Sequence, residues 1–313
     1  MSGVLLQLGL LVLGFVLLVK GADWFVEGAA GIADKLGVPQ LVIGLTIVAM
    51  GTSLPEAAVS ISSALKGSAE IAVGNVLGSN IMNILLILGI TSIITPLAIQ
   101  KSTVAYEIPF VFVITVIFAV LGLMDHQLTR IEGLILWILF LAYLYYLMRM
   151  ARSGADVLEE ADVDENASWL KLLLMVVIGA TLIVIGSNVT VDAASELALL
   201  AGMSKRWVGL TIVAFGTSLP ELVTCVTAAF KKNVDLAIGN IVGSNIFNIL
   251  FVIGTSALIT PVAYQADFLF DSLVAAVTVV LLWICVLNKD RQLKRWGGIL
   301  MVIAYAAYFI YLL

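Results

Sequence analysis

The sequence predicts an all-α integral membrane protein of ten transmembrane helices, arranged as two inverted five-helix repeats with broken helices at the midplane. Three observations support this prediction. The 313 residues are 62% hydrophobic and only 12% charged, which leaves more apolar surface than a water-soluble domain of this size buries. The apolar residues gather in segments long enough to span a bilayer. A long stretch of the first half recurs in the second half.

Ten apolar segments are candidate spans. A bilayer core about 30 Å thick requires about 20 helical residues, so stretches of about 18 apolar residues or more qualify. The segments fall at roughly 3–20, 40–65, 70–95, 104–124, 130–149, 168–190, 205–230, 234–259, 268–287 and 293–312. The first segment precedes further spans and lacks a small-residue cleavage site, so we expect a retained helix and not a signal peptide.

The lysine and arginine residues predict the orientation of these spans. Links after odd-numbered helices hold 12 of them, and links after even-numbered helices hold 4. Because cytoplasmic loops carry the excess of Lys and Arg, both termini are expected on the extracytoplasmic side of the plasma or inner membrane.

An internal repeat is the strongest feature of the sequence. Residues 44–96 recur as residues 209–261 at a constant offset of 165, without a gap, and Pro, Glu, Ser and Asn coincide in register. Chance similarity between apolar segments does not align polar residues in this way. Each unit holds five helices, so the second copy enters the membrane from the opposite side. Transporters built on this plan bind their substrate near the midplane, where the copies meet.

The repeat divides the chain into two domains and a linker: residues 1–151, an acidic cytoplasmic linker at 152–167, and residues 168–313. The linker contains Glu159, Glu160, Asp162, Asp164 and Glu165. We interpret it as a solvated charged segment. A calcium-sensing role is the alternative, but the stretch lacks the central glycine and spaced ligands of a helix–loop–helix calcium site.

The motif GTSLPE occupies residues 51–56 and 216–221, within the second and seventh spans. The proline ring collides with the carbonyl four residues earlier, which belongs to Gly51 or Gly216. A freed carbonyl at membrane depth needs a partner, and a bound cation would supply one. A simple kink is the alternative, but here a carboxylate follows each proline directly.

Glu56 and Glu221 lie well inside their spans. Each buried acid costs roughly 2.5 to 3.5 kcal/mol on insertion scales unless something compensates. Lysine and arginine occur only near the ends of the spans and in the links, so none is available at membrane depth to pair with these acids. Protonation or a metal ion remains.

A second repeated motif supplies neutral oxygens: GNVLGSNIMN at 74–83 and GNIVGSNIFN at 239–248. Ser79 and Asn83 are four residues apart and share a helix face, as do Ser244 and Asn248. Glycines four residues apart let another backbone approach closely; these are Gly74 with Gly78 and Gly239 with Gly243.

These candidate ligands are all hard oxygen donors, without histidine or cysteine. Such a set disfavours zinc and copper and favours hard cations. Ca²⁺ accepts six to eight oxygens in flexible geometry, and Na⁺, of similar radius, can occupy the same oxygen cage. The chain shows no nucleotide-binding or aspartyl-phosphate motif, so ATP is not expected to drive transport. It shows no basic patch for nucleic acid either.

At GTSLPE and GSNIxN, each present twice, the chain resembles the sodium/calcium exchanger family of the calcium/cation antiporters, in its short prokaryotic form. The resemblance covers nearly the whole chain. It implies exchange of Ca²⁺ for several Na⁺ by alternating access, with the first and sixth helices sliding across the other eight. No cofactor is implied, and we expect a monomer to be functional.

The resemblance also implies site residues by motif position. The central ligands would be Glu56, Glu221, Thr52, Ser53, Thr217 and Ser218. Flanking sodium sites would use Ser79, Ser244 and the carbonyls of Ala49 and Ala214. Asn83 matches the family pattern, whereas Asn248 departs from it, because some members carry Asp there, including potassium-dependent ones. The amide removes one charge, which leaves the number of sodium ions and any potassium dependence open.

Three other functions fit part of this pattern. A proton/calcium antiporter of the same fold is the closest, although the Thr-Ser pairs favour sodium because protons need no hydroxyl cage. A cation channel is less expected, because the polar residues cluster at one depth. An intramembrane enzyme is not expected, because the chain has one histidine and no nucleophile–base arrangement.

Overall fold

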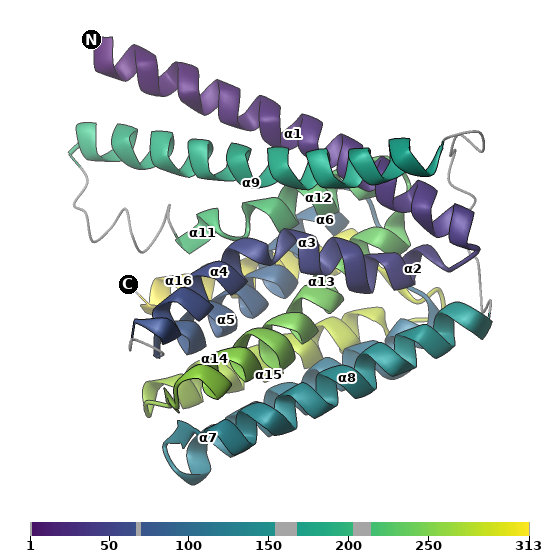
Figure 1. The fold of residues 1–313 in the computed structure, drawn as a ribbon, viewed down its shortest axis with the longest axis vertical. Coiled ribbons are helices and arrows are strands. Elements are labelled where there is room, and N and C mark those ends of the chain that lie inside the picture. Colours follow the sequence, from purple (N-terminus) through teal and green to yellow (C-terminus); the bar gives the residue numbers. More distant parts are fainter. Residues whose placement is uncertain (1, 67–69, 154–167, 203–213, 313) are drawn as a thin grey trace.

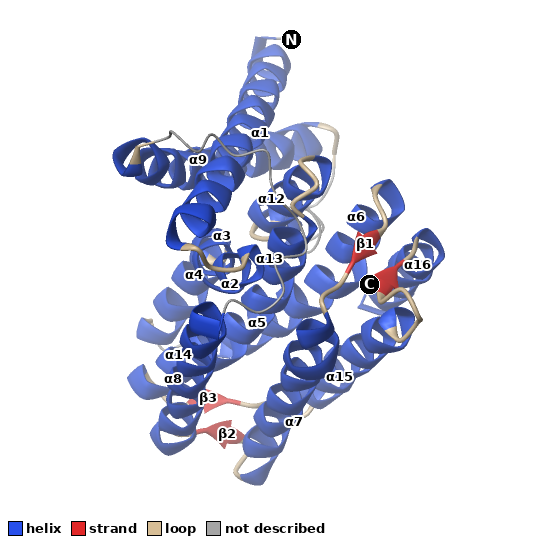
Figure 2. Cartoon of the chain, turned by 90° about the vertical axis from the view of Figure 1, so that its right-hand side faces the viewer, coloured by secondary structure: helices blue, strands red, loops and turns tan. Residues whose placement is uncertain are grey.

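The computed structural model describes residues 2–66, 70–153, 168–202 and 214–312. It is a helical bundle with a few two-residue strands (Figure 2). Within these residues, eight helices are long and apolar enough to cross a membrane, and a ninth span consists of Gln40–Thr52 and Leu54–Leu65, bent by 52°. The predicted all-α membrane class is therefore confirmed. Part of the span expected at 205–230 and most of the linker expected at 152–167 lie outside the described residues.

Two long helices, α1 (Ser2–Leu36) and α9 (Trp169–Leu200), lie side by side (Figure 1). They touch through glycines: a Cβ added at Gly21 would lie 2.8 Å from the carbonyl oxygen of Gly179. A larger side chain at either position would force the two backbones apart.

Both helices are longer than the predicted spans at 3–20 and 168–190, so those boundaries were wrong. At about 1.5 Å per residue, the 35 residues of α1 extend about 52 Å, which exceeds the bilayer core. Charged residues after Lys20 suggested an end to the first span. The helix continues because Phe25 and Ala29 remain buried, whereas Glu27 lies on the exposed face.

The second span is broken before Pro55, as the motif predicts. Its segments are α2 (Gln40–Ile43), the π-helical η1 (Gly44–Val48), α3 (Ala49–Thr52) and α4 (Leu54–Leu65). The second copy of the motif gives α11 (Ala214–Gly216) and α12 (Leu219–Phe230), separated by Thr217 and Ser218.

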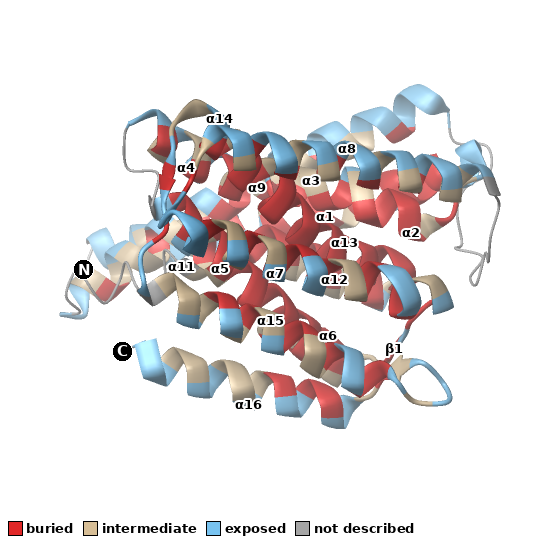
Figure 3. Ribbon diagram, turned by 90° about the horizontal axis from the view of Figure 1, so that it is seen from below, coloured by how far each residue is buried: buried red, intermediate tan, exposed pale blue. Residues whose placement is uncertain are grey.

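The core consists of two helical rods. They comprise α5 (Glu70–Met82), η2 (Asn83–Leu88) and α6 (Gly89–Ile94), then α13 (Val234–Phe247), η5 (Asn248–Ile253) and α14 (Gly254–Ile259). Every residue of α13 is buried (Figure 3). The predicted close approach is confirmed on α13, where a Cβ at Gly243 would lie 2.7 Å from the Leu45 carbonyl oxygen. It was wrong for α5, where a Cβ at Gly74 would meet only Phe268 at 3.7 Å and one at Gly78 nothing within 4 Å.

Each rod changes to π-helical winding at a motif asparagine, which the sequence analysis did not predict. The segment η2 begins at Asn83 and η5 begins at Asn248. Single π-helical turns within α-helices are frequent at functional sites, so both asparagines are candidates for a functional role.

Four longer elements surround the core: η3 (Thr103–Glu107) with α7 (Ile108–Met124), α8 (Arg130–Ser153), α15 (Asp267–Val286) and α16 (Arg295–Leu312). The helix α8 packs on α14, and α16 packs on α6. Short antiparallel strands join the two halves of the chain (Figure 2). The pairs are β1 (Leu97–Ala98) with β4 (Gln292–Leu293), and β2 (Gln127–Leu128) with β3 (Val262–Ala263).

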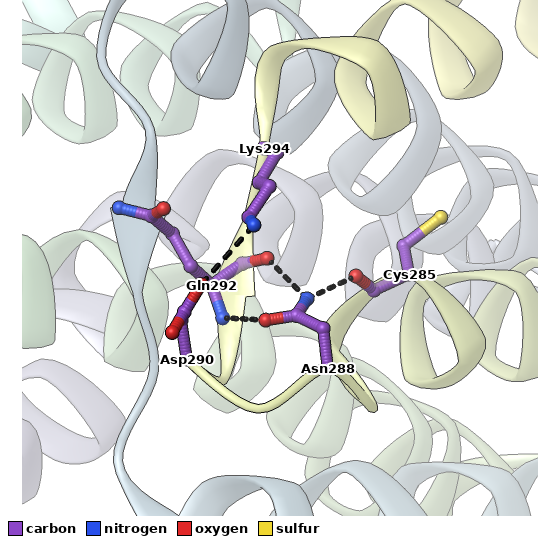
Figure 4. Close-up of polar contacts among 5 residues, drawn as sticks. All are labelled: Cys285, Asn288, Asp290, Gln292 and Lys294. Atoms are coloured by element: carbon purple, nitrogen blue, oxygen red, sulfur yellow. Dashed lines mark hydrogen bonds and ion pairs between the residues drawn. The ribbon is translucent and has the colours of Figure 1, made fainter.

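One side chain organises the turn between α15 and β4 (Figure 4). The Asn288 amide nitrogen donates to the carbonyl oxygens of Cys285 at 2.9 Å and Gln292 at 2.7 Å, and the Gln292 N–H donates to Asn288 Oδ1 at 3.1 Å. Asparagine favours such turns because its side chain bonds to nearby backbone. The turn directs β4 back toward β1.

Candidate functional site

Two acidic side chains lie at the centre of the bundle. Glu56 and Glu221 are each 1% exposed and lie in the first turns of α4 and α12, directly after the two helix breaks. The N-terminus of a helix favours negative charge. The two carboxyl groups are close enough to interact electrostatically, so the breaks bring both acids into one region.

Each acid is held by the motif of the other repeat. Ser53 Oγ donates to Glu221 Oε1 at 2.8 Å, and Ser218 Oγ donates to Glu56 Oε1 at 3.2 Å. The Thr217 hydroxyl is also within reach of Glu56. The two GTSLPE motifs therefore hydrogen-bond to each other reciprocally and form a single polar cluster.

Three of the four expected flanking residues, Ser79, Ser244 and Ala49, lie beside this cluster. Ser218 Oγ lies 3.4 Å from Ser79 Oγ, and Ser244 Oγ donates to the Ala49 carbonyl oxygen at 3.4 Å. Thr52 also donates to Ala49, at 3.3 Å, or to Asn240 Oδ1, at 2.9 Å. Ala214 is the first residue of α11.

The two motif asparagines flank the acids from the core rods. Asn83 Nδ2 donates to Asn245 Oδ1 at 3.0 Å, and Asn248 Nδ2 donates to Asn80 Oδ1 at 3.1 Å. The segment η2, which begins at Asn83, packs against α12, and η5, which begins at Asn248, packs against α4. Each asparagine therefore begins a segment that packs on the helix carrying an acid of the opposite repeat.

Four buried oxygens in this region accept no hydrogen bond from any described residue: Glu56 Oε2, Glu221 Oε2, Asn83 Oδ1 and Asn248 Oδ1. We call these four atoms the open oxygens. Buried polar atoms normally have a partner, and these four are matched between the repeats. Because all are hard acceptors, their natural partner is a hard cation such as Ca²⁺ or Na⁺.

One expectation about the helix breaks was wrong in detail. Pro220 was expected to free the Gly216 carbonyl for a cation, but that oxygen accepts a hydrogen bond from Ser187 Oγ of α9 at 2.8 Å. The neighbouring helix therefore supplies a partner for this carbonyl.

The sequence analysis missed several polar residues near the site. Asn80 and Asn245 contact Asn248 and Asn83, and Asn240 contacts Thr52. Their repetition in the GNxxGSNxxN motif was the available signal. The sequence analysis assigns only the serine and the last asparagine of each motif to the ion-facing side, so it does not include these residues.

A third buried acid, Glu107, lies apart from the cluster and was also missed. It is 1% exposed and accepts a hydrogen bond from the Tyr146 hydroxyl, between η3 and α8. It lines a peripheral cavity of about 450 Å³ whose walls are mainly aromatic and aliphatic. Its position at one end of an apolar segment gave no reason to treat it as an intramembrane acid.

Comparison with known proteins identifies a family. The sequence pattern of the family described as "Sodium/calcium exchanger protein" matches residues 6–149 and 171–313. The chain is 32% identical to the sodium/calcium exchanger MaX1 of Methanosarcina acetivorans, covering 97% of each chain. It is 40% identical to the putative antiporter CaxA of Alkalimonas amylolytica, covering 94% of this chain and 95% of that one.

A solved structure gives the same result in three dimensions. The sodium-calcium exchanger NCX_Mj, soaked with zero Na⁺ and Ca²⁺, superposes with a TM-score of 0.85 at 33% identity. The match covers 99% of this chain and all of the other. The similarity thus extends over the whole fold and is not confined to the motifs.

Proposed function

The chain belongs to the sodium/calcium exchanger family and is a membrane antiporter of Na⁺ and Ca²⁺; from this premise we propose that its ions bind at the open oxygens around Glu56 and Glu221. The family membership does not favour the proton-driven alternative.

The open oxygens are the observation that carries this proposal. A buried acceptor without a partner costs about 1–3 kcal/mol, and more when it is charged. Four such atoms, matched between the repeats, would destabilise the core unless an occupant compensated for them. Two carboxylates and two amides balance one divalent cation in charge, and Na⁺ can share the same oxygens.

The remaining ligands follow from position in the cluster. We assign the hydroxyls of Thr52, Ser53, Thr217 and Ser218 to the central site. We assign Ser79, Ser244 and the carbonyls of Ala49 and Ala214 to flanking sodium sites. Support comes from the hydrogen bonds that join Ser218 to Ser79 and Ser244 to Ala49. Each flanking site would thus combine groups from both repeats.

We also propose the finer architecture predicted from the sequence: ten helices in two inverted repeats, 1–151 and 168–313, joined by the linker at 152–167. Reciprocal hydrogen bonds between Asn80 and Asn245, 165 residues apart, support it. So do the strand pairs that join the halves, and the two separate stretches of the family match.

Alternating access would come from α1 and α9 sliding together across the other helices. These two helices make extensive contact with each other, and their close backbone contact at Gly21 and Gly179 supports movement as one unit. We place both termini outside the cytoplasm, in the plasma or inner membrane. Because one chain supplies every proposed ligand, a monomer would suffice.

Ion flux in proteoliposomes tests the proposed site. Vesicles loaded with Na⁺ are diluted into Na⁺-free buffer containing Ca²⁺, and Ca²⁺ uptake is compared with uptake under a proton gradient. We expect Na⁺-driven uptake by the native chain and none by Glu56→Gln or Glu221→Gln. Normal uptake by either variant would refute the site, and uptake driven only by protons would refute sodium as the counterion.

A further inference from the structure

Asn80 and Asn245 form a closed hydrogen-bond network between the two core rods. Asn80 Nδ2 donates to the Asn245 backbone oxygen at 3.2 Å, and Asn245 Nδ2 donates to the Asn80 backbone oxygen at 3.2 Å. Both residues are at least 97% buried. The pairing is reciprocal and joins α5 to α13.

These two bonds fix how each amide is turned. A backbone carbonyl only accepts hydrogen bonds, so the side-chain nitrogen of Asn80 must face Asn245, and the reverse. Oδ1 of each amide then points elsewhere. Asn80 Oδ1 accepts from Asn248 at 3.1 Å, and Asn245 Oδ1 accepts from Asn83 at 3.0 Å.

The amides of Asn83 and Asn248 are oriented in the same way, by the residues to which they donate. An amide Oδ1 is an acceptor only, so Asn83 and Asn248 must turn their nitrogens toward it. Their own oxygens are thereby turned away, and these are two of the four open oxygens. Four buried hydrogen bonds thus lead to two oxygens presented without a partner.

We propose that Asn80 and Asn245 are positioning residues for ion exchange: they orient the amides of Asn83 and Asn248 so that the ion site meets oxygen at both positions. This inference rests on the proposed ion site. Without these residues either amide could rotate by half a turn and present N–H₂ groups, which repel a cation. Each repeat therefore orients a ligand of the other.

The consequence concerns affinity for the ion more than stability of the fold. Loss of a group that orients a metal ligand typically lowers metal affinity about 10- to 100-fold. A purely structural asparagine would also lower stability when removed, so stability alone does not distinguish the two roles. The two roles can be distinguished by replacing the oriented asparagine with aspartate, because both terminal atoms of an aspartate side chain are oxygens.

The experiment measures Ca²⁺ affinity by titration calorimetry on the purified full chain. Asn245→Ala is made alone and in an Asn83→Asp background. In the native background we expect Ca²⁺ affinity to fall about 10- to 100-fold. In the Asn83→Asp background both side-chain ends are oxygens, so orientation no longer matters and the further loss should stay below about threefold.

An equal loss in both backgrounds, or no loss in either, would overturn the positioning role. Asn288→Ala, which removes amide bonds in the peripheral α15–β4 turn, is the matched control and should bind Ca²⁺ normally. If Asn245→Ala does not fold, the mirror test uses Asn80→Ala with and without Asn248→Asp.

Glu56→Gln and Glu221→Gln are titrated in parallel. Normal Ca²⁺ binding by both would mean that the ion site itself is misplaced. Loss of binding in these two variants, together with normal binding by Asn245→Ala, would refute only the positioning role.

Discussion

The centre of the molecule and the surface of α1 differ in symmetry. At the centre, the serine contacts to the two acids match between the repeats: Ser53 with Glu221 corresponds to Ser218 with Glu56. At the surface, Lys231 forms ion pairs with Asp23 at 2.6 Å and Glu27 at 3.4 Å.

The equivalent surface position in the first repeat is different. Lys66 corresponds to Lys231, and Asn188 and Asp192 correspond to Asp23 and Glu27. Lys66 makes no ion pair with any residue in the described part of the chain. The proposed ion ligands are thus divided equally between the repeats, whereas the ion pairs between α1 and the end of α12 have no counterpart in the first repeat. Many transporters move one group of helices around a fixed binding site. Such a movement would change the surface contacts of α1 and leave the paired contacts at the central site in place.

The largest effect tests the symmetry of the centre. If the acids are equivalent, Glu56→Gln and Glu221→Gln should lower Ca²⁺ affinity by similar amounts, at least about 100-fold, because each loses a charged ligand. Calorimetry on both variants measures this, with size-exclusion profiles as the control for folding. A large loss in one variant only would break the equivalence.

Asn248→Asp should retain transport but make it depend on pH. A carboxylate has no hydrogen to donate to Asn80 Oδ1, and an unsatisfied buried group costs about 1–3 kcal/mol, or about 5- to 160-fold in a binding constant. Protonation restores the donor, so the network is intact at low pH and lost as pH rises. Uptake rates across a pH series measure this, with the native chain as the control. A profile identical to the native one would mean that Asn248 is not a ligand.

Lys231→Ala should have a smaller effect that depends on the conformation of α1. The side chains of its partners Asp23 and Glu27 are 35% and 49% exposed, and exposed pairs contribute about 0.2–1 kcal/mol. We expect a shift of roughly two- to fivefold in apparent Na⁺ affinity, weakened by added salt. Lys66→Ala is the matched control and should show no such shift in this conformation. Equal shifts in both variants would contradict the asymmetry.

The smallest effect distinguishes the central acids from the peripheral one. Glu107→Gln should keep Na⁺-driven Ca²⁺ uptake within about twofold, because a glutamine oxygen can still accept from Tyr146. Uptake assays beside Glu56→Gln measure the contrast. Loss of transport in Glu107→Gln would place a further functional acid outside the central cluster.

The sequence predicted the parts of the site that carry an unusual physical requirement. A charged residue at membrane depth and a proline inside a helix both need compensation, so Glu56, Glu221 and the two breaks could be found without a structure. The membrane class followed from composition alone. The contact partners of the motif residues could not be predicted from the sequence, because contacts between α5 and α13 depend on how the two repeats pack.

Two features were not accessible from periodicity. The π-helical segments begin at Asn83 and Asn248, and all their other residues are apolar, so no periodicity marks the change in winding. The true length of α1 was missed because its charged residues lie on one exposed face, whereas Phe25 on the other face stays buried.

Anomalous diffraction from crystals soaked in Ca²⁺, or in a heavier divalent ion, tests the central claim most directly. We predict a peak between the two helix breaks, with Glu56 Oε2 and Glu221 Oε2 both about 2.3–2.6 Å from a bound Ca²⁺, and with the oxygens of Asn83 and Asn248 turned toward it. A peak elsewhere, with the four open oxygens bonded to one another or to protein donors, would contradict the account.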